Sequence, residues 1–522
     1  MSSGENWRGA VYEVRLGPPG HGGFCVARHE GRVLFVRHGL PGELVRAQVT
    51  EDRGGSFCRA DAIEILEPSV DRVDPTCPVS GPGGAGCCDF SHATPEAQRA
   101  LKASVVSEQL RRLADWETDF EVEVIPIPPR GTAPRRVGRS GIATGGVRGI
   151  AAGRVRSAAA GRVSGTAAGR VSGAAAGRVS GAAAGRVSGA AAGRVSGSAV
   201  HDEANSLTVS DLDVNGIAPL SASGGWRSRV RLVVDAEGRA GVHGYRSTDV
   251  ITDLRCPQPI AGAMTGIADR TWTPGADLVV AVDGDGVRHI VELAPAEVRS
   301  GSRPEARDRR GGRNSAAARR AAASRARTER VIEGSGVAVQ YVAGRRWEVS
   351  ATGFWQPHSG AAQMYSDVVA DWSDAAPGTL GWDLYCGVGV FAARLADQVG
   401  ADGAVHGVES ARSAVEEGES ALRDLPWVQL QAERVERWIV EQPDTAPDVV
   451  VLDPPRAGAG KDVIAALGER GPRRIVHIGC DPAAFARDLG LYRNAGYKPG
   501  GLRVFDAFPA THHIECVALL ER

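Results

Sequence analysis

The chain has 522 residues and nearly balanced charge, with 61 Lys and Arg against 62 Asp and Glu. This length exceeds what one hydrophobic core usually supports, so we expect two to four domains. No apolar run long enough to span a membrane is free of charges, and the N-terminus lacks a basic region followed by an apolar one. We therefore expect a cytoplasmic protein without a membrane span.

Residues 1–70 are predicted to form a small β domain. Short strand-like stretches such as Val33–Val36 and Leu44–Val49 alternate with glycine-rich turns such as Gly17–Gly20. About five short strands suit an OB-like barrel, which often serves as a platform for oligonucleotides. The composition is equally consistent with a generic β barrel that has no role in nucleic-acid binding.

A central domain of α+β type is expected from residues 71–128 and 225–340. Apolar residues at helical spacing in 95–115 indicate one amphipathic helix, and 226–234 is strand-like. Between the two parts lies an insert, residues 129–224, in which 151–198 repeat an eight-residue unit rich in Gly and Ala. Each unit has too few apolar side chains to bury to offset the entropy lost on ordering, so we expect these repeats to be disordered. They have either no function or the role of a loose arm that contacts RNA.

Residues 297–331 form a second biased segment, rich in Arg. Such a run is either a flexible solvated loop or a source of phosphate contacts. The segment interrupts the end of the predicted central domain.

Residues 341–522 alternate strand and helix patterns, which predicts an α/β domain with a Rossmann-like, doubly wound sheet. The predicted strands are Leu380–Leu384, Ala404–Val408, Asp448–Leu452, Arg474–Ile478 and Cys516–Leu520.

The segment Asp383–Phe391 follows the first of these strands and opens a helix. Gly387 and Gly389 allow a tight turn and close approach of a ligand to the helix N-terminus. Glu409 ends the next strand, where it can accept hydrogen bonds from ribose hydroxyls. The order of Asp, the Gly-x-Gly pair and a Glu at the end of the next strand favours S-adenosylmethionine over a dinucleotide as the ligand. The alternative is a glycine-rich turn of some other α/β protein.

Three further positions suggest chemistry. Asp453–Arg456 ends a buried strand, where ligands of such sheets bind, although a bare Asp-Pro-Pro-Arg can be only a turn. Cys480 is expected at a helix N-terminus, which would lower its thiol pKa and suit a nucleophile, unless it is a buried inert thiol. Glu515 could act as a base, although alone it would more often be a surface acid. The neighbouring histidines at 512 and 513 lack partners at metal-ligand spacing, so no zinc site is expected.

Together these elements resemble the S-adenosylmethionine-dependent RNA uridine C5-methyltransferases. Residues 7–66 are similar to the TRAM domain, an OB-like RNA-binding module that many members carry, notably those acting on 23S rRNA. The resemblance extends to the central domain and leaves out the two biased segments. The matching elements are Phe354–Gln356, Asp383–Phe391, Glu409, Asp453–Arg456, Cys480–Pro482 and Glu515.

The resemblance implies roles for individual residues. Cys480 would be the nucleophile that adds to uracil C6, and Glu515 the base that removes the C5 proton. The target uridine would be single-stranded or flipped out of a helix. The residues implied to line the S-adenosylmethionine site are Gln356, Tyr385, Glu409 and Asp453.

Members of the family often carry a 4Fe–4S cluster on four cysteines of the central domain. The corresponding cysteines would be Cys77, Cys87, Cys88 and Cys256, but Ala85 stands where the usual second cysteine would be. The resemblance therefore leaves two outcomes open, a retained cluster or a degraded site without iron.

The function predicted from the sequence is methyl transfer from S-adenosylmethionine to C5 of a specific uridine in RNA. The TRAM-like domain favours ribosomal RNA, with transfer RNA as the alternative, and we expect a monomer. Two rivals are a methyltransferase of another target and a catalytically inactive RNA-binding or assembly protein.

Overall fold

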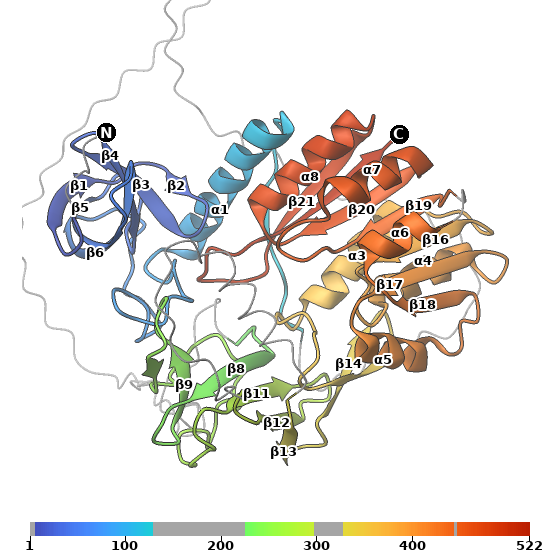
Figure 1. Cartoon of the computed structure of the whole chain (residues 1–522), viewed down its shortest axis with the longest axis horizontal. Coiled ribbons are helices and arrows are strands. Elements are labelled where there is room, and N and C mark those ends of the chain that lie inside the picture. Colours follow the sequence, from blue (N-terminus) through green and yellow to red (C-terminus); the bar gives the residue numbers. More distant parts are fainter. Residues whose placement is uncertain (1–5, 129–224, 297–326, 443–445) are drawn as a thin grey trace, which may run out of the picture. The chain divides into compact units, whose positions relative to one another are not determined.

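The computed structural model describes residues 6–128, 225–296, 327–442 and 446–522 (Figure 1). The eight-residue repeats and residues 297–326 of the Arg-rich segment lie outside the described residues. Among the described residues, no helix is long and apolar enough to cross a membrane.

The N-terminal part forms a barrel-like, six-stranded sheet in the order β1-β5-β6-β4-β3-β2. Small and β-branched residues alternate along its strands, so every second side chain enters a compact core that includes Leu34, Val36 and Val45. The OB-like architecture predicted from the glycine-rich turns is confirmed. The strands are β1 (Val11–Arg15), β2 (Pro19–Gly20), β3 (Phe24–His29), β4 (Arg32–Arg37), β5 (Leu44–Asp52) and β6 (Phe57–Glu67).

A second six-stranded sheet has the order β10-β9-β8-β11-β12-β13, and all its pairings are antiparallel. Its last strand, β13, includes residues 329–331, although the sequence predicts that they belong to the flexible Arg-rich segment. Arg327 and Arg330 are ordered there because they pair with Asp277 and Glu292 of this sheet. The strands are β8 (Arg229–Val234), β9 (Ala240–His243), β10 (Val250–Ile251), β11 (Asp277–Val282), β12 (Arg288–Leu293) and β13 (Glu329–Glu333).

The C-terminal part is built on an eight-stranded mixed sheet in the order β18-β17-β16-β19-β20-β22-β21-β7. The predicted α/β, Rossmann-like class is confirmed. The hairpin of β14 (Val337–Val342) and β15 (Arg345–Ser350) follows β13 in the chain. The sheet strands are β7 (Val122–Val124), β16 (Leu380–Leu384), β17 (Ala404–Glu409), β18 (Val428–Ala432), β19 (Val449–Leu452), β20 (Arg474–Gly479), β21 (Lys498–Asp506) and β22 (Glu515–Glu521).

Helices cover both faces of this sheet, because its buried strands are apolar on both sides. Val449 and Val451 of β19 face a core with α3, α4 and α5, whereas Val450 and Leu452 face a core with α1, α6, α7 and α8. The helices are α1 (Pro95–Gln109), α3 (Ala361–Ser373), α4 (Val390–Val399), α5 (Arg412–Leu422), α6 (Val435–Glu441), α7 (Gly460–Arg470) and α8 (Pro482–Asn494).

The segment before the repeat insert belongs with the C-terminal sheet. The helix expected over 95–115 is α1, which continues as a π-helical segment, η1 (Leu110–Ala114), and ends at Asp115 in a left-handed conformation. Val106 and Leu110 pack in the same core as α8. The strand β7 then pairs in parallel with β21, although the sequence pattern had placed it in the central domain.

Candidate active site

Polar side chains stand where the parallel strands of the C-terminal sheet end. Glu409 is the last residue of β17, Asp453 follows β19, and Cys480 follows β20. Parallel strands bring their carboxyl ends to one edge of a sheet, which is where ligands of such folds bind. Three residues that are 27 to 71 positions apart in the sequence therefore meet at one edge.

Glu515 reaches the same edge for a different reason. It begins β22, which runs antiparallel to β20 with Cys516 opposite Gly479. An antiparallel strand starts where its parallel neighbour ends, so this register sets Glu515 beside Cys480. The Glu515 side chain is buried, with 3% of the residue exposed.

One cavity of about 760 Å³ contains these groups. A cavity of this size suits a nucleoside-like ligand and part of a second one. The structure therefore brings together all the catalytic and donor-site residues predicted from the sequence. Its lining includes Gln356, Tyr385, Glu409, Asp453, Cys480 and Glu515.

The turn between β16 and α4 forms one end of the cavity. Gly387 and Gly389 both have positive φ, at 55° and 81°, which a residue with a side chain adopts only with strain. A Cβ on Gly387 would meet no atom within 4 Å, so this backbone borders open space. The Glu409 carboxylate accepts hydrogen bonds from the backbone N–H groups of Gly387, at 3.3 Å, and Ala411, at 2.8 Å.

These residues fit S-adenosylmethionine. Val388, Val390 and Ala414 line the cavity and offer apolar contact to a nucleobase, while the adjacent Glu409 offers a carboxylate to ribose hydroxyls. The open backbone at Gly387 permits close approach of the ligand.

The buried carboxyl group of Asp383 stabilises this turn. It is fully buried, and its Oδ2 accepts a 2.7 Å hydrogen bond from the backbone N–H of Ala392 in α4. Burial raises the pKa of Asp383 well above the ordinary carboxyl value. Asp383 thus joins β16 to the first turn of α4 without facing the ligand, since it does not line the cavity.

Asp453 lines the same cavity as Glu409 and Cys480. Burial raises its pKa to about 7, and Gln356 Nε2 lies 3.5 Å from its Oδ2. A carboxyl group with such a pKa can change its protonation near neutral pH. Gln356 is a neutral neighbour that can donate to either form.

The expectation that a helix N-terminus lowers the Cys480 pKa is wrong for this structure. Burial, followed by the nearby Glu515 and Asp453 carboxyls, raises the Cys480 pKa to about 12. The helix amides are already used, because Asp481 caps α8 and accepts from Ala483 N at 3.1 Å and Ala484 N at 2.8 Å. The thiol therefore requires activation when ligands enter the cavity.

Glu515 is also perturbed. Burial and the nearby Asp453 raise the Glu515 pKa well above its ordinary value, while Arg456 opposes the shift. A raised pKa makes a carboxylate a stronger base for a carbon-bound proton. The same burial disfavours the charged form of the Glu515 carboxyl.

Three cavity residues received no role from sequence reasoning. Phe354, Arg456 and His513 line the same cavity, and Phe354 is 72% exposed. The sequence could have identified Phe354 and Arg456, because both lie within the segments that resemble the family. His513 had been considered only as a metal ligand, and its packing against Phe508 and His512 is a tertiary feature.

Four cysteines of the predicted cluster converge in the structure. Cys77 makes hydrogen-bonding contact with Cys88 and Cys256, and Cys88 also contacts Cys87 and Cys256. Gln258 Nε2 donates to Cys88 Sγ at 3.2 Å. In the described part of the chain, however, no group of three or more His, Cys, Asp and Glu is arranged to hold a single metal ion. Four thiols match the donors of an iron–sulfur cluster.

Comparison with known proteins agrees with this geometry. A family profile described as tRNA (Uracil-5-)-methyltransferase matches residues 324–522, and a TRAM domain profile matches residues 7–62. The chain is 36% identical to an uncharacterized RNA methyltransferase of Streptomyces avermitilis, with 98% of both chains covered. It is 27% identical to the 23S rRNA (uracil(1939)-C(5))-methyltransferase RlmD of Alkalilimnicola ehrlichii, over 98% of this chain and 96% of that protein.

A solved structure shares the fold over almost the whole chain. The tRNA (uracil-54, C5)-methyltransferase of Pyrococcus abyssi, in complex with S-adenosyl-L-homocysteine, aligns with a TM-score of 0.56 at 16% identity. The alignment covers 98% of this chain and 100% of that one. The full-length relatives and the two family profiles place the chain among the TRAM-containing RNA methyltransferases of the family described as tRNA (Uracil-5-)-methyltransferase.

Proposed function

We propose that this protein methylates C5 of a uridine in RNA, with Cys480 as nucleophile and Glu515 as base. The observation that carries the proposal is their adjacency in one cavity. The register of β20 and β22 sets the two residues side by side, and the cavity that they line also contains the Glu409 end that fits the methyl donor.

The chemistry explains why a thiol is needed. Uracil C5 is a weak nucleophile, but addition of the Cys480 thiolate to C6 moves the C5–C6 electron pair toward C5 and O4. When bound, S-adenosylmethionine supplies a methyl group on a positively charged sulfur. The enolate carbon C5 forms the new bond to this methyl group, and the sulfur keeps the electron pair of the bond that breaks.

Glu515 completes the reaction. Its carboxylate takes the proton from C5, the electrons of the C–H bond restore the C5–C6 double bond, and the C6–S bond breaks to regenerate the Cys480 thiolate. The raised pKa of Glu515 favours this step, because a more basic carboxylate accepts a carbon-bound proton more readily.

Arg456 supports the nucleophile in this scheme. Its positive charge lowers the pKa of both Cys480 and Glu515, against the effect of burial. The positive sulfur of the bound methyl donor acts in the same direction, because a nearby cation favours a thiolate. Binding of the donor is thus expected to activate a thiol that is protonated in the free enzyme.

A trapping experiment tests the proposal. RNA in which uridine is replaced by 5-fluorouridine should form a stable adduct with the wild type and S-adenosylmethionine, since fluorine at C5 cannot leave as a proton. Cys480→Ala should form none while still binding S-adenosylmethionine, as measured by calorimetry. Turnover retained by Cys480→Ala, or no wild-type adduct under conditions of RNA binding, would overturn the assignment.

Ribosomal RNA is the proposed substrate, supported by the full-length similarity to RlmD. Transfer RNA is the alternative, since the family profile and the Pyrococcus abyssi protein are named for it. Mapping 5-methyluridine in both RNA classes from cells with and without the gene decides between them. If no 5-methyluridine is lost, the better interpretation is a methyltransferase of a different target or an inactive RNA-binding protein.

We also propose that Cys77, Cys87, Cys88 and Cys256 hold a 4Fe–4S cluster. Their mutual thiol contacts support this, since four Cys thiolates are the usual ligands of such a cluster. The cluster would join the 77–88 loop to Cys256 and has no step in methyl transfer. Anaerobically purified protein should contain about four iron atoms per chain, and Cys256→Ser should lose them. Iron-free protein with four alkylatable thiols would contradict the proposal.

A further inference from the structure

The loop of residues 507–514 leads from β21 into β22 and ends directly before Glu515. On the strand side, the Glu515 backbone is fixed by its pairing with Phe505 of β21. In the described part of the chain, no hydrogen bond holds the Glu515 carboxyl group itself. The direction of this side chain therefore depends on the conformation of the loop before it.

Two consecutive residues of a distant segment hold this loop. The Nδ1 atom of His512 lies 2.5 Å from Oδ2 of Asp89, and because a carboxylate only accepts, the imidazole N–H donates. The backbone N–H of Phe90 donates to the carbonyl of Ala510 at 2.9 Å. Asp89 is buried, with 3% of the residue exposed, so no bulk water competes for its contact with His512.

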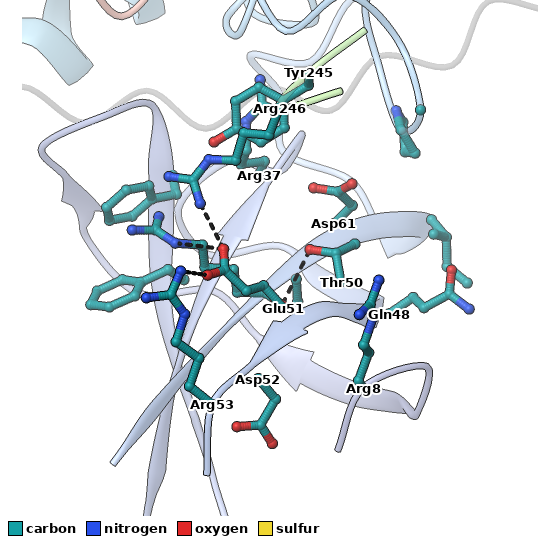
Figure 2. Close-up of a pocket in the computed structure, with 17 residues that line it drawn as sticks. Arg8, Arg37, Gln48, Thr50, Glu51, Asp52, Arg53, Asp61, Tyr245 and Arg246 are labelled. Atoms are coloured by element: carbon teal, nitrogen blue, oxygen red, sulfur yellow. Dashed lines mark hydrogen bonds and ion pairs between the residues drawn. The ribbon is translucent and has the colours of Figure 1, made fainter. Parts of the chain in front are cut away.

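A residue of the barrel orients Asp89. Arg37 of β4 donates to Oδ1 of Asp89, which leaves Oδ2 for His512. The Arg37 guanidinium also lies 3.6 Å from the ring centroid of Tyr245, and both residues line a cavity of about 690 Å³ (Figure 2). With one partner on each oxygen, the Asp89 carboxylate cannot rotate without losing a charged hydrogen bond.

The turn between β2 and β3 packs against the same pair. A Cβ on Gly23 would lie 3.1 Å from the Cβ atoms of both Asp89 and His512, so this turn approaches as closely as a glycine allows. His21 of the same turn pairs with Asp481, the residue after Cys480, at 3.1 Å. The close packing leaves little room for another placement of the His512 ring.

We propose that Asp89 and His512 are positioning residues for Glu515 in the methylation reaction. Their contact fixes the loop three residues before Glu515, so that the carboxylate reaches the C5 proton of the methylated uracil. Neither residue lines the active-site cavity, so both act through Glu515. The inference rests on the proposed function for the role of Glu515 as base, and it names the residues that set the geometry of this base.

The proposal assigns the pair to one step of the reaction. Addition of the Cys480 thiolate to C6 and transfer of the methyl group to C5 need no base at the C5 proton, whereas the last step does. A displacement of about 1 Å can slow a step by about 100-fold. Loss of the His512 contact should therefore leave a methylated adduct, with the bond between Cys480 and C6 still intact, waiting for proton removal.

The test uses the full-length protein, ordinary uridine RNA and S-adenosylmethionine that carries a radioactive methyl group. His512→Ala should accumulate a labelled protein–RNA adduct on a denaturing gel, and its kcat should fall by about 10- to 100-fold. In a single turnover, its rate of methyl transfer to RNA should stay within about threefold of the wild type. The variant should fold because Asp89 keeps Arg37 as a partner, and an unchanged affinity for S-adenosylmethionine checks this.

Two variants serve as controls. His512→Asn restores a side-chain N–H close to the place of Nδ1, so it should recover most of the wild-type kcat and show little adduct. His243→Ala removes an exposed histidine and should change neither quantity. Wild-type turnover by His512→Ala would overturn the proposal. Slow turnover without the labelled adduct would also overturn it, because a general loss of structure slows methyl transfer itself.

The 5-fluorouridine assay separates this inference from the proposed function. If the wild type forms the 5-fluorouridine adduct and Glu515→Gln accumulates the methylated adduct but His512→Ala does not, the inference fails and the function stands. If the wild type forms no adduct with 5-fluorouridine RNA, the proposed function fails and the positioning role falls with it. Accumulation by both Glu515→Gln and His512→Ala, with recovery in His512→Asn, supports both.

Discussion

At the scale of single residues, burial disfavours the charged forms of both proposed reactive groups. Burial raises the pKa of Cys480 to about 12 and raises that of Glu515 well above its usual range. Both groups must lose a proton before they can act in the proposed reaction. Since the thiolate is the reactive form, we expect the Cys480 thiol of the free enzyme to react slowly with alkylating agents.

These shifts predict a methylation rate that rises with pH. The pKa values of both groups are raised, so the active, deprotonated forms increase as pH increases, and kcat/KM should climb from pH 6 through pH 9 without a plateau near 7. Glu515→Gln should let a methylated covalent adduct accumulate on ordinary uridine RNA, because the C5 proton then has no acceptor. A flat profile, or full turnover by Glu515→Gln, would contradict both assignments.

At the scale of elements, the loop between β21 and β22 delivers Glu515, and α1 holds that loop. Fully buried Lys102 of α1 pairs with Asp506 at 2.5 Å and donates to Phe508 O at 3.1 Å. Gln98 Oε1 accepts from Ala510 N at 2.8 Å. A helix about 400 residues earlier in the chain thus fixes the approach to the catalytic strand.

Removing the lysine should therefore destabilise the protein. Lys102→Met leaves Asp506 buried without its partner, which costs about 3–5 kcal/mol in comparable cases. Urea unfolding followed by tryptophan fluorescence measures the loss, and adding Asp506→Leu should recover much of it. Lys461→Met, at an exposed position of α7, is the control and should change stability little. Equal stability of the two single variants would show that the buried pair is not an anchor.

At the scale of the whole molecule, several histidines are buried in neutral form in different parts of the chain. Burial lowers the pKa of His38 and His477 to about 3, and that of His92 and His358 to about 4. The unfolded chain binds these protons at the ordinary value of 6.5, so it gains protons before the folded state does. The stability that neutral histidines contribute is present above pH 6.5 and is lost as pH falls toward 4.

The melting temperature should accordingly drop between pH 6.5 and pH 4. His38 has a φ of 66°, which Asn tolerates better than most residues, so His38→Asn should make this drop smaller. His243→Gln, at an exposed position, should leave the drop unchanged. Differential scanning calorimetry across this pH range measures both, and a melting temperature independent of pH would refute the linkage.

The sequence by itself determined the fold classes and predicted the residues that line the candidate site. Glycine-rich turns between short strands predicted the barrel, and alternating strands and helices predicted the Rossmann-like sheet, because these patterns follow local backbone preferences. The segments with Glu409, Asp453 and Cys480 were recognisable because each directly follows or ends a buried strand, a position that sequence patterns locate well.

Only the tertiary structure determined the environment of those residues. The register of β20 and β22 brought Glu515 to Cys480, and burial beside two carboxyls raised the thiol pKa that a helix N-terminus alone would have lowered. The contact of β7 with β21 likewise joins positions far apart in the chain. Desolvation and charge depend on neighbours in space, and a sequence lists neighbours only along the chain.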